Sequence, residues 1–442
     1  MKKLRKIGAI ILAVMMIAMV GLAYATTTAE DMDGTEGVIG SFTAPDSPVA
    51  KNDKVNLRKA LIVYNKDENT VNAPTVTYTF EIISGSAGKT VADAGGPSLH
   101  ATGSSVSTLT KAGLTGATIG SVVLTPSVTL NASETGTVNT FPVEVDFSGV
   151  TWTGAGVYRY QINETTVAAN KVAAGILDTS TVDTVYLDVY VKDGSTAGTY
   201  EIYGFVCFAN NNDIDGTNTN SVAAAKKIEG FVSVDADGDG TVEETETADK
   251  YYTFNVEVSK TLVNDQAMNS HKFPFSVDFT NASVTANVKP IIEKTGEPTA
   301  TAATAGVSGL DDTPTIANGE KVKYIGIPVG ISAGTTVSVK EYNDVTGTVY
   351  KYTHKVDTAG ASTAASLNPS TSASPIWSTE ATLSITANAA DTTAHTIAFT
   401  NTLEQISPTG YVSRYAPYAL ILIGGIALLI IARKHRKHTD EE

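Results

Sequence analysis

The middle of the chain consists of short segments in which apolar and polar residues alternate. Examples are VTYTFEI, FPVEVDFSGV and TVYLDVYV in the first half, and KFPFSVDF, TTVSVKEYND and HTIAFTNTLE in the second. A period of two places every second side chain on a buried face, as in a half-buried β-strand. Turn signals such as residues 192–195 (KDGS) separate the segments, and no stretch before residue 410 has a convincing helical period. The pattern predicts an all-β chain of sandwich domains.

These segments fall into two blocks with a similar order of strands, which we interpret as an approximate internal repeat. We expect a first sandwich domain at 56–234 and a second at 250–405, joined by an acidic linker at 235–249. The segment 26–55 is polar and without a periodic pattern, and is expected to be a flexible leader.

The first residues of the chain have the three parts of a secretory signal peptide. Lys2, Lys3, Arg5 and Lys6 are followed by an apolar run and by Ala23-Tyr24-Ala25, a small-x-small cleavage site. We expect cleavage after Ala25, which makes 1–25 a signal peptide. The alternative interpretation is a permanent membrane anchor.

The last residues, 406–442, combine an apolar segment with a basic tail. Ala416 to Ala432 is near the lower length limit for a spanning helix. The Arg433, Lys434, Arg436 and Lys437 cluster behind it is expected to stay in the cytoplasm. These features alone indicate a protein with a single transmembrane helix.

Pro408, Thr409 and Gly410 stand a few residues before the apolar segment. The order Pro-Thr-Gly, spacer, apolar helix and basic tail resembles a cell-wall sorting signal. The resemblance implies that a sortase cuts between Thr409 and Gly410 and joins the threonine carbonyl to an amine. The best-known pattern is Leu-Pro-x-Thr-Gly, whereas here the proline directly precedes Thr409, so the sortase class stays open. A plain membrane-anchored protein is the alternative.

Composition excludes several classes of function. The single cysteine, Cys207, rules out an internal disulfide, so an exported chain must gain its rigidity in another way. A formal net charge of −15 argues against nucleic acid as a partner. We find no metal cluster, nucleophile elbow or paired-carboxylate motif, and therefore do not expect an enzyme.

Three residues of the second block carry the predicted chemistry. Lys260 lies in VEVSKTL, Glu341 follows TVSVK, and Asn401 lies in IAFTNTL, the last strand. Together with GVYRYQINE at 156–164, these motifs resemble the isopeptide-linkage domains of Gram-positive pilins and adhesins. The resemblance covers most of 55–405. It implies tandem immunoglobulin-like β-sandwich domains, in which a first-strand lysine is joined to a last-strand asparagine with the help of a glutamate.

The chemistry of such a bond is physically coherent. A lysine amine is a nucleophile only when neutral, and burial in an apolar core lowers its pKa while raising that of a nearby carboxyl. A protonated Glu341 is expected to polarise the Asn401 carbonyl for attack by Lys260. The products are an amide and ammonia, no cofactor is needed, and the reaction occurs once per domain rather than with turnover.

The first block has only part of this pattern. Lys59 lies on its first strand and Glu164 ends GVYRYQINE. Asn210, in the FANN run after a strand, is the candidate asparagine. Alternatively, KIEGFVSV is the last strand and places Ser233 near the position of the asparagine, in which case the first bond is missing.

The acidic linker contains a twelve-residue pattern of the calcium-loop type, with acids at the first, third and fifth positions, glycine at the sixth and glutamate at the twelfth. The expected Ca²⁺ ligands are Asp235, Asp237, Asp239, Thr241, Glu243 and Glu246. The flanking segments indicate strands, so the loop would stand alone rather than in an EF-hand domain. The alternative is a solvated acidic linker.

These features together predict a structural cell-surface protein of the Gram-positive type, secreted and anchored to the cell wall. It is either a pilin subunit or a wall-anchored stalk or adhesin; the alternative is a ligand-binding adhesin, anchored to membrane or wall, that does not polymerise. The expected partners are sortase, peptidoglycan or neighbouring pilin subunits, the membrane before sorting, and a host or surface ligand. A Tyr-Pro-Lys motif of the pilin type is not evident, so polymerisation stays open.

Calcium is expected to stiffen the linker, because a bound cation removes the repulsion among its carboxylates. Proteolysis between Ser233 and Tyr251 should therefore be slower in calcium than in chelator. Equal cleavage under both conditions would contradict a calcium site.

Overall fold

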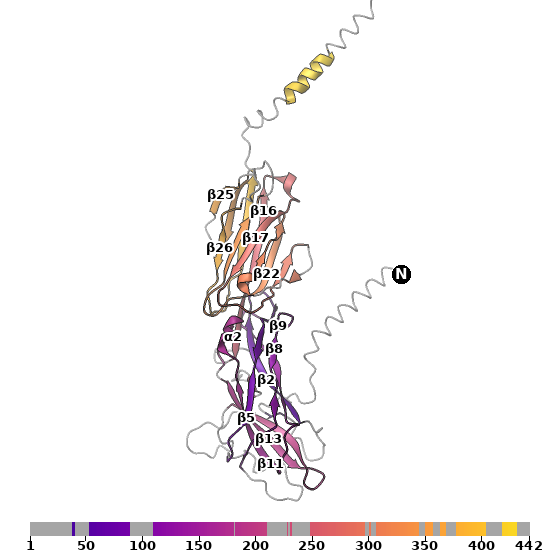
Figure 1. The fold of residues 1–442 in the computed structure, drawn as a ribbon. Coiled ribbons are helices and arrows are strands. Elements are labelled where there is room, and N and C mark those ends of the chain that lie inside the picture. The colour runs from indigo at the N-terminus through magenta and orange to yellow at the C-terminus, as the bar shows by residue number, and fades with distance from the viewer. Residues whose placement is uncertain are drawn as a thin grey trace, which may run out of the picture.

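The computed structural model is an elongated molecule in which two β-sandwiches follow one another, with a separate helix near the C-terminus (Figure 1). The all-β prediction is confirmed. The structure describes residues 38–39, 53–88, 109–180, 182–209, 228, 230–231, 248–296, 300–301, 306–343, 350–356, 363–367, 377–403 and 418–430. The predicted signal peptide, linker loop and sorting motif lie outside these residues.

The first sandwich packs two main sheets around an apolar core. One sheet has the order β1-β14-β13-β11-β5, and the facing strands include β2, β10 and β7. The elements of this part are β1 (Val38–Ile39), β2 (Lys54–Tyr64), β3 (Thr70–Asn72), β4 (Val76–Tyr78), β5 (Phe80–Ser84), β6 (Lys111–Ala112), β7 (Thr118–Ile119), β8 (Val122–Leu124), β9 (Thr129–Asn131), β10 (Thr137–Asp146), β11 (Gly156–Glu164), α2 (Ala168–Ala173), β12 (Ile176–Leu177), β13 (Thr184–Asp193), β14 (Tyr200–Phe208) and β15 (Gly230–Phe231).

The second sandwich repeats this arrangement. One sheet holds β16, with β22 and β27 as its neighbours, and the facing sheet has the order β20-β17-β23-β26. The elements are β16 (Asp249–Val263), η1 (Gln266–Met268), β17 (Phe273–Thr280), β18 (Ile291–Lys294), β19 (Ala300–Thr301), η2 (Val307–Gly309), β20 (Asp311–Asp312), β21 (Thr315–Ile316), β22 (Lys321–Pro328), β23 (Thr336–Glu341), β24 (Tyr350–Val356), β25 (Thr363–Leu367), β26 (Ala381–Ser384) and β27 (His395–Leu403).

The strands form where the alternation predicts them. In β17 every odd-numbered residue from Phe273 to Phe279 is buried, while the residues between them are half-buried or exposed. β13 and β14 form an antiparallel hairpin, but Lys192 and Asp193 still pair with Glu201 and Tyr200, so the chain turns between Asp193 and Tyr200, slightly later than the predicted turn at 192–195. In β17, burial of the odd-numbered side chains therefore selects the face that the strand presents to the core.

Strand β16 belongs to both sandwiches. Its first four residues pair in parallel with β2, and its later residues pair with β22 and β27. Tyr251 packs in the first core and Tyr252 in the second, so successive side chains serve different domains. One uninterrupted strand thus forms the backbone connection between the two cores.

Side-chain amides reinforce this junction. Asn65 donates from Nδ2 to Thr253 Oγ1 at 2.8 Å and to Asn255 Oδ1 at 2.9 Å, and Asn255 Nδ2 donates back to Asn65 Oδ1 at 2.8 Å. Lys323 and Glu68 form an ion pair across the same boundary. Because these amides satisfy each other, the junction buries polar groups without leaving them unpaired.

The short helix α2 was not predicted from the sequence. It spans only Ala168–Ala173, less than two turns, and so is too short to produce a helical period. Its position matters because Lys171 is almost fully buried beneath it.

Near the C-terminus, residues 418–430 are helical, and their apolar side chains are exposed. Of the helices in the described part of the chain, none is long and apolar enough to cross a membrane. The remainder of the apolar segment predicted between Ala416 and Ala432 lies outside the described residues.

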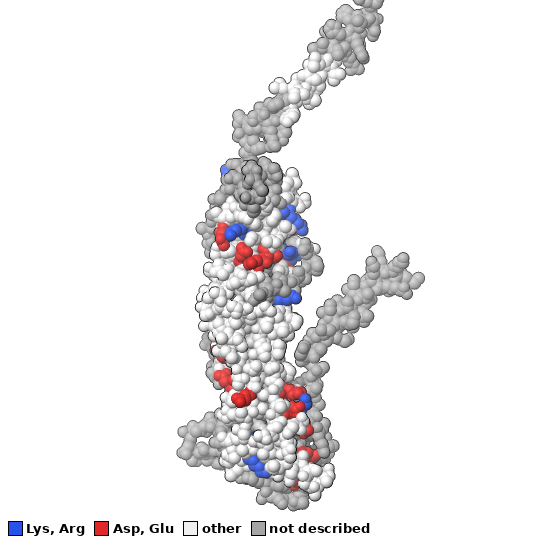
Figure 2. Space-filling model, in the orientation of Figure 1, with Lys and Arg blue, Asp and Glu red and all other residues white. Residues whose placement is uncertain are grey.

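On the face shown in Figure 2, the charged side chains of the described residues gather in two regions, with an uncharged stretch between them. Other ion pairs of the described residues lie inside the sandwiches, where water does not screen them: the side chains of Lys59 and Glu164 and those of Lys260 and Glu341 are almost fully buried.

Candidate functional site

The structure brings together the three residues predicted in the second domain. Lys260 on β16 and Asn401 on β27 lie on parallel neighbouring strands, and Asn401 stands opposite Leu262. The two side chains are therefore two positions apart and share one face of the sheet. Glu341 ends β23 in the facing sheet and reaches the same point from across the core.

One carboxylate oxygen connects the other two groups. Glu341 Oε1 lies 2.8 Å from Lys260 Nζ, and Asn401 Nδ2 donates to the same oxygen at 2.7 Å. Among the described residues, Glu341 Oε2 and Asn401 Oδ1 have no hydrogen-bond partner. The side chains of Lys260 and Glu341 are fully removed from solvent. The arrangement places an amine, an acid and an amide in contact inside a dry core.

Aromatic rings form the walls of this site. The ring centre of Phe273 lies 4.7 Å from Lys260 Nζ. Phe275 and Phe399 pack edge to face with ring centres 5.3 Å apart. Phe275 stands opposite Glu341 on the neighbouring strand, and Phe399 lies two residues before Asn401 on the same strand. These rings exclude water, so burial governs the protonation of the polar groups.

Burial shifts both titratable groups toward their neutral forms. It lowers the pKa of Lys260 to about 8, even though the adjacent Glu341 favours the charged amine. It raises the pKa of Glu341, against the opposing effects of Lys260 and of the hydrogen bond from Asn401. A neutral amine beside a neutral acid is the state that acyl transfer from an amide requires.

The first domain contains a second buried cluster of the same kind. Lys59 on β2 lies 2.7 Å from Glu164 Oε2 and 2.8 Å from Asp249 Oδ2. The side chains of Lys59 and Asp249 are fully buried, and that of Glu164 is 2% exposed. Glu164 ends β11 in one sheet, and Asp249 begins β16 in the other.

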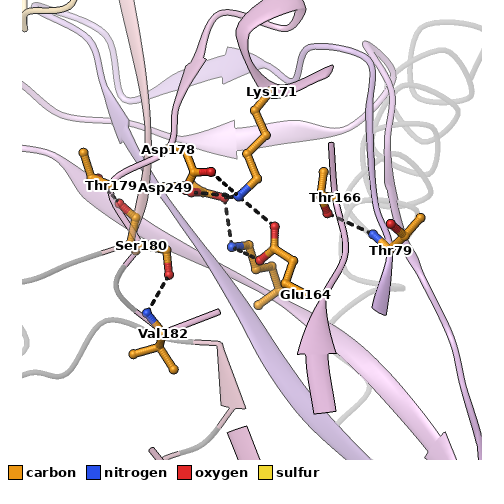
Figure 3. Close-up of polar contacts among 11 residues, drawn as sticks. Thr79, Glu164, Thr166, Lys171, Asp178, Thr179, Ser180, Val182 and Asp249 are labelled. Carbon is orange, nitrogen blue, oxygen red and sulfur yellow. Dashed lines mark hydrogen bonds and ion pairs between the residues drawn. The ribbon is translucent and has the colours of Figure 1, made fainter. Parts of the chain in front are cut away.

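A second lysine completes this cluster. Lys171 Nζ lies 2.7 Å from Glu164 Oε1, 3.2 Å from Asp249 Oδ2 and 3.2 Å from the more exposed Asp178. Figure 3 shows Lys171 descending from its helix onto these carboxylates. Burial lowers the pKa of Lys171, but the charges of Asp249 and Glu164 outweigh burial and raise the pKa overall. Lys171 is therefore a fixed positive charge.

A buried tyrosine lies beside this cluster. The ring centre of Tyr78 lies 4.8 Å from Lys59 Nζ. Burial and the charges of Asp249 and Glu164 raise the pKa of the Tyr78 hydroxyl well above its usual value.

The sequence predicted Lys59 and Glu164 but not the group that they face. Asn210 and Ser233, the two residues considered for the asparagine position, lie outside the described residues. The carboxyl beside Lys59 belongs to Asp249, which was assigned to the linker, and Lys171 was missed altogether. The sequence signal for Asp249 is an acid two residues before Tyr251, where the aromatic segment YYTFNVEV begins, and this signal is weak without the strand register.

The sorting residues Pro408, Thr409 and Gly410 lie outside the described residues. So do the six expected calcium ligands, Asp235, Asp237, Asp239, Thr241, Glu243 and Glu246.

No protein-family model and no curated protein matches the sequence. Among solved structures, the chain is similar to the major pilin protein T3.2 of Streptococcus pyogenes, with 19% identity, a TM-score of 0.39, and coverage of 81% of this chain and 100% of the other. It is also similar to the S. pyogenes major pilin, with 18% identity, a TM-score of 0.32, and coverage of 80% and 99%. A pilus-presented adhesin matches at 15% identity and a TM-score of 0.22, over 49% of this chain and 36% of its own.

The shifted pKa of Lys260 predicts how stability depends on pH when the site is unreacted. In an Asn401→Ala variant, folded Lys260 binds fewer protons than the unfolded chain between pH 8 and 10.5, the folded and reference pKa values. The free energy of unfolding should therefore rise with pH across this window, by up to about 3 kcal/mol. Urea unfolding at several pH values measures the slope.

The matched control is the double variant Lys260→Met, Asn401→Ala, which lacks the titrating amine and should lack the slope. A rise of the same size in the control would show that another group is responsible.

Proposed function

We propose that this protein is a structural subunit of the cell surface whose second domain is closed by an amide bond between Lys260 and Asn401. The observation that supports the proposal most directly is that Glu341 Oε1 is within hydrogen-bonding distance of both the amine and the leaving amide nitrogen. A buried lysine beside a carboxyl and a carboxamide is costly as a purely structural arrangement, because three polar groups leave water.

The reaction follows from the positions of the atoms. The neutral amine of Lys260 attacks Cγ of Asn401 while the protonated Glu341 carboxyl donates its proton to Asn401 Nδ2. The bond from Cγ to Nδ2 breaks and Nδ2 leaves as ammonia, and the Glu341 carboxylate takes the proton that Nζ loses as the new amide forms. The carboxyl ends in its starting state, so each domain needs one glutamate and no external reagent.

The position of the bond suits a load-bearing protein. Lys260 and Asn401 lie on adjacent parallel strands, and the segment between them contains nearly the whole second sandwich. Cross-linking the ends of so long a loop is worth about 5 kcal/mol by analogy with disulfides. More importantly, force applied along the strands would load a covalent bond rather than the hydrogen bonds of the sheet.

The location of the protein is proposed from the ends of the sequence. A cleaved signal peptide at 1–25 and sortase cleavage between Thr409 and Gly410 would carry the folded domains to the wall. Two roles fit such a subunit, a pilin that polymerises and an anchored stalk or adhesin that does not. Ligand binding by the adhesin is the second candidate function.

Closure of the second domain predicts a mass deficit. The wild-type chain should contain the Lys260 and Asn401 peptides joined, with the loss of one ammonia, when the purified protein is digested and analysed by mass spectrometry. Glu341→Ala should leave these peptides separate, because no group remains to move the proton. The variant should also unfold at a lower temperature.

Glu341→Gln provides the matched control, since it keeps the shape of the side chain but cannot exchange a proton as a carboxyl does. Separate peptides in the wild type would refute the bond. Joined peptides in Glu341→Gln would refute the role of Glu341 while leaving the bond in place.

Sortase anchoring predicts that Thr409→Ala moves the protein out of the wall fraction. Wild-type protein should be released by wall-digesting enzymes, and the variant by detergent alone, because its threonine carbonyl is no longer transferred. Identical release of both proteins by detergent would contradict anchoring. The same wall extracts separate the two roles, since a pilin gives a ladder of high masses and a monomeric anchor gives one band.

A further inference from the structure

The strand register identifies Asp249 as the counterpart of Asn401. In the second domain, the residue that faces Lys260 stands opposite Leu262 on the neighbouring parallel strand. In the first domain, Asp249 stands opposite Leu61, two residues after Lys59, again on a parallel strand. In both domains the acid that contacts the lysine ends a strand of the facing sheet.

The distances agree with this equivalence. Lys59 Nζ lies 2.8 Å from Asp249 Oδ2 and 2.7 Å from Glu164 Oε2, close to the corresponding contact of 2.8 Å between Lys260 and Glu341. The difference between the two sites is chemical, because the group facing the lysine is a carboxyl in the first domain and a carboxamide in the second.

From this geometry we propose that the first domain closes through an amide between Lys59 Nζ and Asp249 Cγ, and that Lys171 supplies the positive charge that a carboxyl needs in order to be attacked. This extends the proposed function from one domain to both, but it concerns different atoms and different peptides from the Lys260–Asn401 bond.

The positive charge of Lys171 would stabilise the additional negative charge that forms when a carboxylate, rather than an amide, is attacked. Attack on a neutral amide places one negative charge on the tetrahedral intermediate, whereas attack on an ionised carboxyl places two. Lys171 Nζ lies 3.2 Å from Asp249 Oδ2 and donates to Oδ1 at 3.4 Å, where that charge develops. In the described part of the second domain, the only ion pair of Glu341 is with Lys260, and an amide there requires no second cation.

The reaction balances without an external reagent. Glu164 Oε2 takes a proton from the Lys59 ammonium, the neutral amine attacks Cγ of Asp249, and one carboxyl oxygen leaves as water with the two protons that the amine has lost. Glu164 and Lys171 keep their charges and remain an ion pair at 2.7 Å. Closure therefore removes one buried cation and one buried anion, which lowers the desolvation cost of the cluster.

The test uses the full-length chain made by cell-free translation in detergent, sampled over time, digested and analysed by mass spectrometry. In the wild type, the Lys59 and Asp249 peptides should be joined with the loss of one water. Asp249→Asn should give the same linked product with the loss of ammonia, and Asp249→Ala should give none. Recovery of separate Lys59 and Asp249 peptides from the mature wild type would overturn the proposal and leave an ionic cluster.

The role of Lys171 is tested by rescue. Lys171→Met should slow closure of the first domain on the order of 10²-fold, the typical cost of removing one charge-stabilising donor. Adding Asp249→Asn to this variant should restore closure, because a carboxamide does not need the second cation. Closure of Lys171→Met at the wild-type rate, or failure of the double variant to recover, would overturn the role of Lys171.

The Lys260–Asn401 peptides provide the internal reference in every sample. Their linkage shows that each variant has folded in the second domain. If the Lys260 and Asn401 peptides are joined but the Lys59 and Asp249 peptides are separate, the bond proposed for the first domain is rejected and that of the second domain stands. If only the Lys59 and Asp249 peptides are joined, the bond proposed for the second domain is rejected.

Discussion

The contact between a buried lysine and a buried carboxyl at the centre of each sandwich is the interaction on which the architecture depends. Neither charge is tolerable there alone, since transfer of an unpaired ion into an apolar core costs several kcal/mol. The contact requires that the two sheets of a sandwich pack so that the strand carrying the lysine, β2 or β16, faces the end of the strand carrying the glutamate, β11 or β23. Lys260 with Glu341 and Lys59 with Glu164 both meet this requirement, at 2.8 Å and 2.7 Å. A slip of one residue in β16 or β2 would turn the lysine to the other face of its sheet and leave the acid uncompensated. The register of the first strand is thus fixed by electrostatics as well as by the apolar core.

The two domains show different ways of keeping such groups inside. The second site is nearly neutral, because burial moves Lys260 and Glu341 toward their uncharged forms and the third member is an amide. In the first site, by contrast, Lys171 lies within 2.7 Å of one carboxylate and 3.2 Å of another, so charge balance is reached by adding a cation. A third strategy is seen on another part of β11, where Arg159 and Asp188 form a fully buried pair with Nε to Oδ1 at 2.7 Å and Nη2 to Oδ2 at 2.8 Å. There the two hydrogen bonds satisfy the ions directly.

The fold could be predicted largely from local pattern, and the second site from local pattern together with a family resemblance. Strands such as Phe273–Thr280 are recognised by the strict alternation of apolar and polar residues, and Lys260, Glu341 and Asn401 each lie within such a strand. The first site could be predicted only in part. Asp249 can be recognised as a partner of Lys59 only when β16 is known to pair with β2, nearly two hundred residues earlier in the chain. The register between two distant strands cannot be predicted from the sequence of either strand. Lys171 comes from a helix of six residues, which is below the length at which periodicity is detectable.

Because β16 contributes side chains to both cores, the evolution of this segment is constrained. Odd-numbered side chains at the start of the strand face the first core, as Tyr251 does, and even-numbered ones from Tyr252 onward face the second. Asp249 and Lys260 must therefore remain an odd number of positions apart. Insertion or deletion of a single residue between them would turn one of the two side chains away from its core. The length of this segment is therefore constrained in addition to its largely buried composition, whereas the loops of most proteins tolerate insertions and deletions.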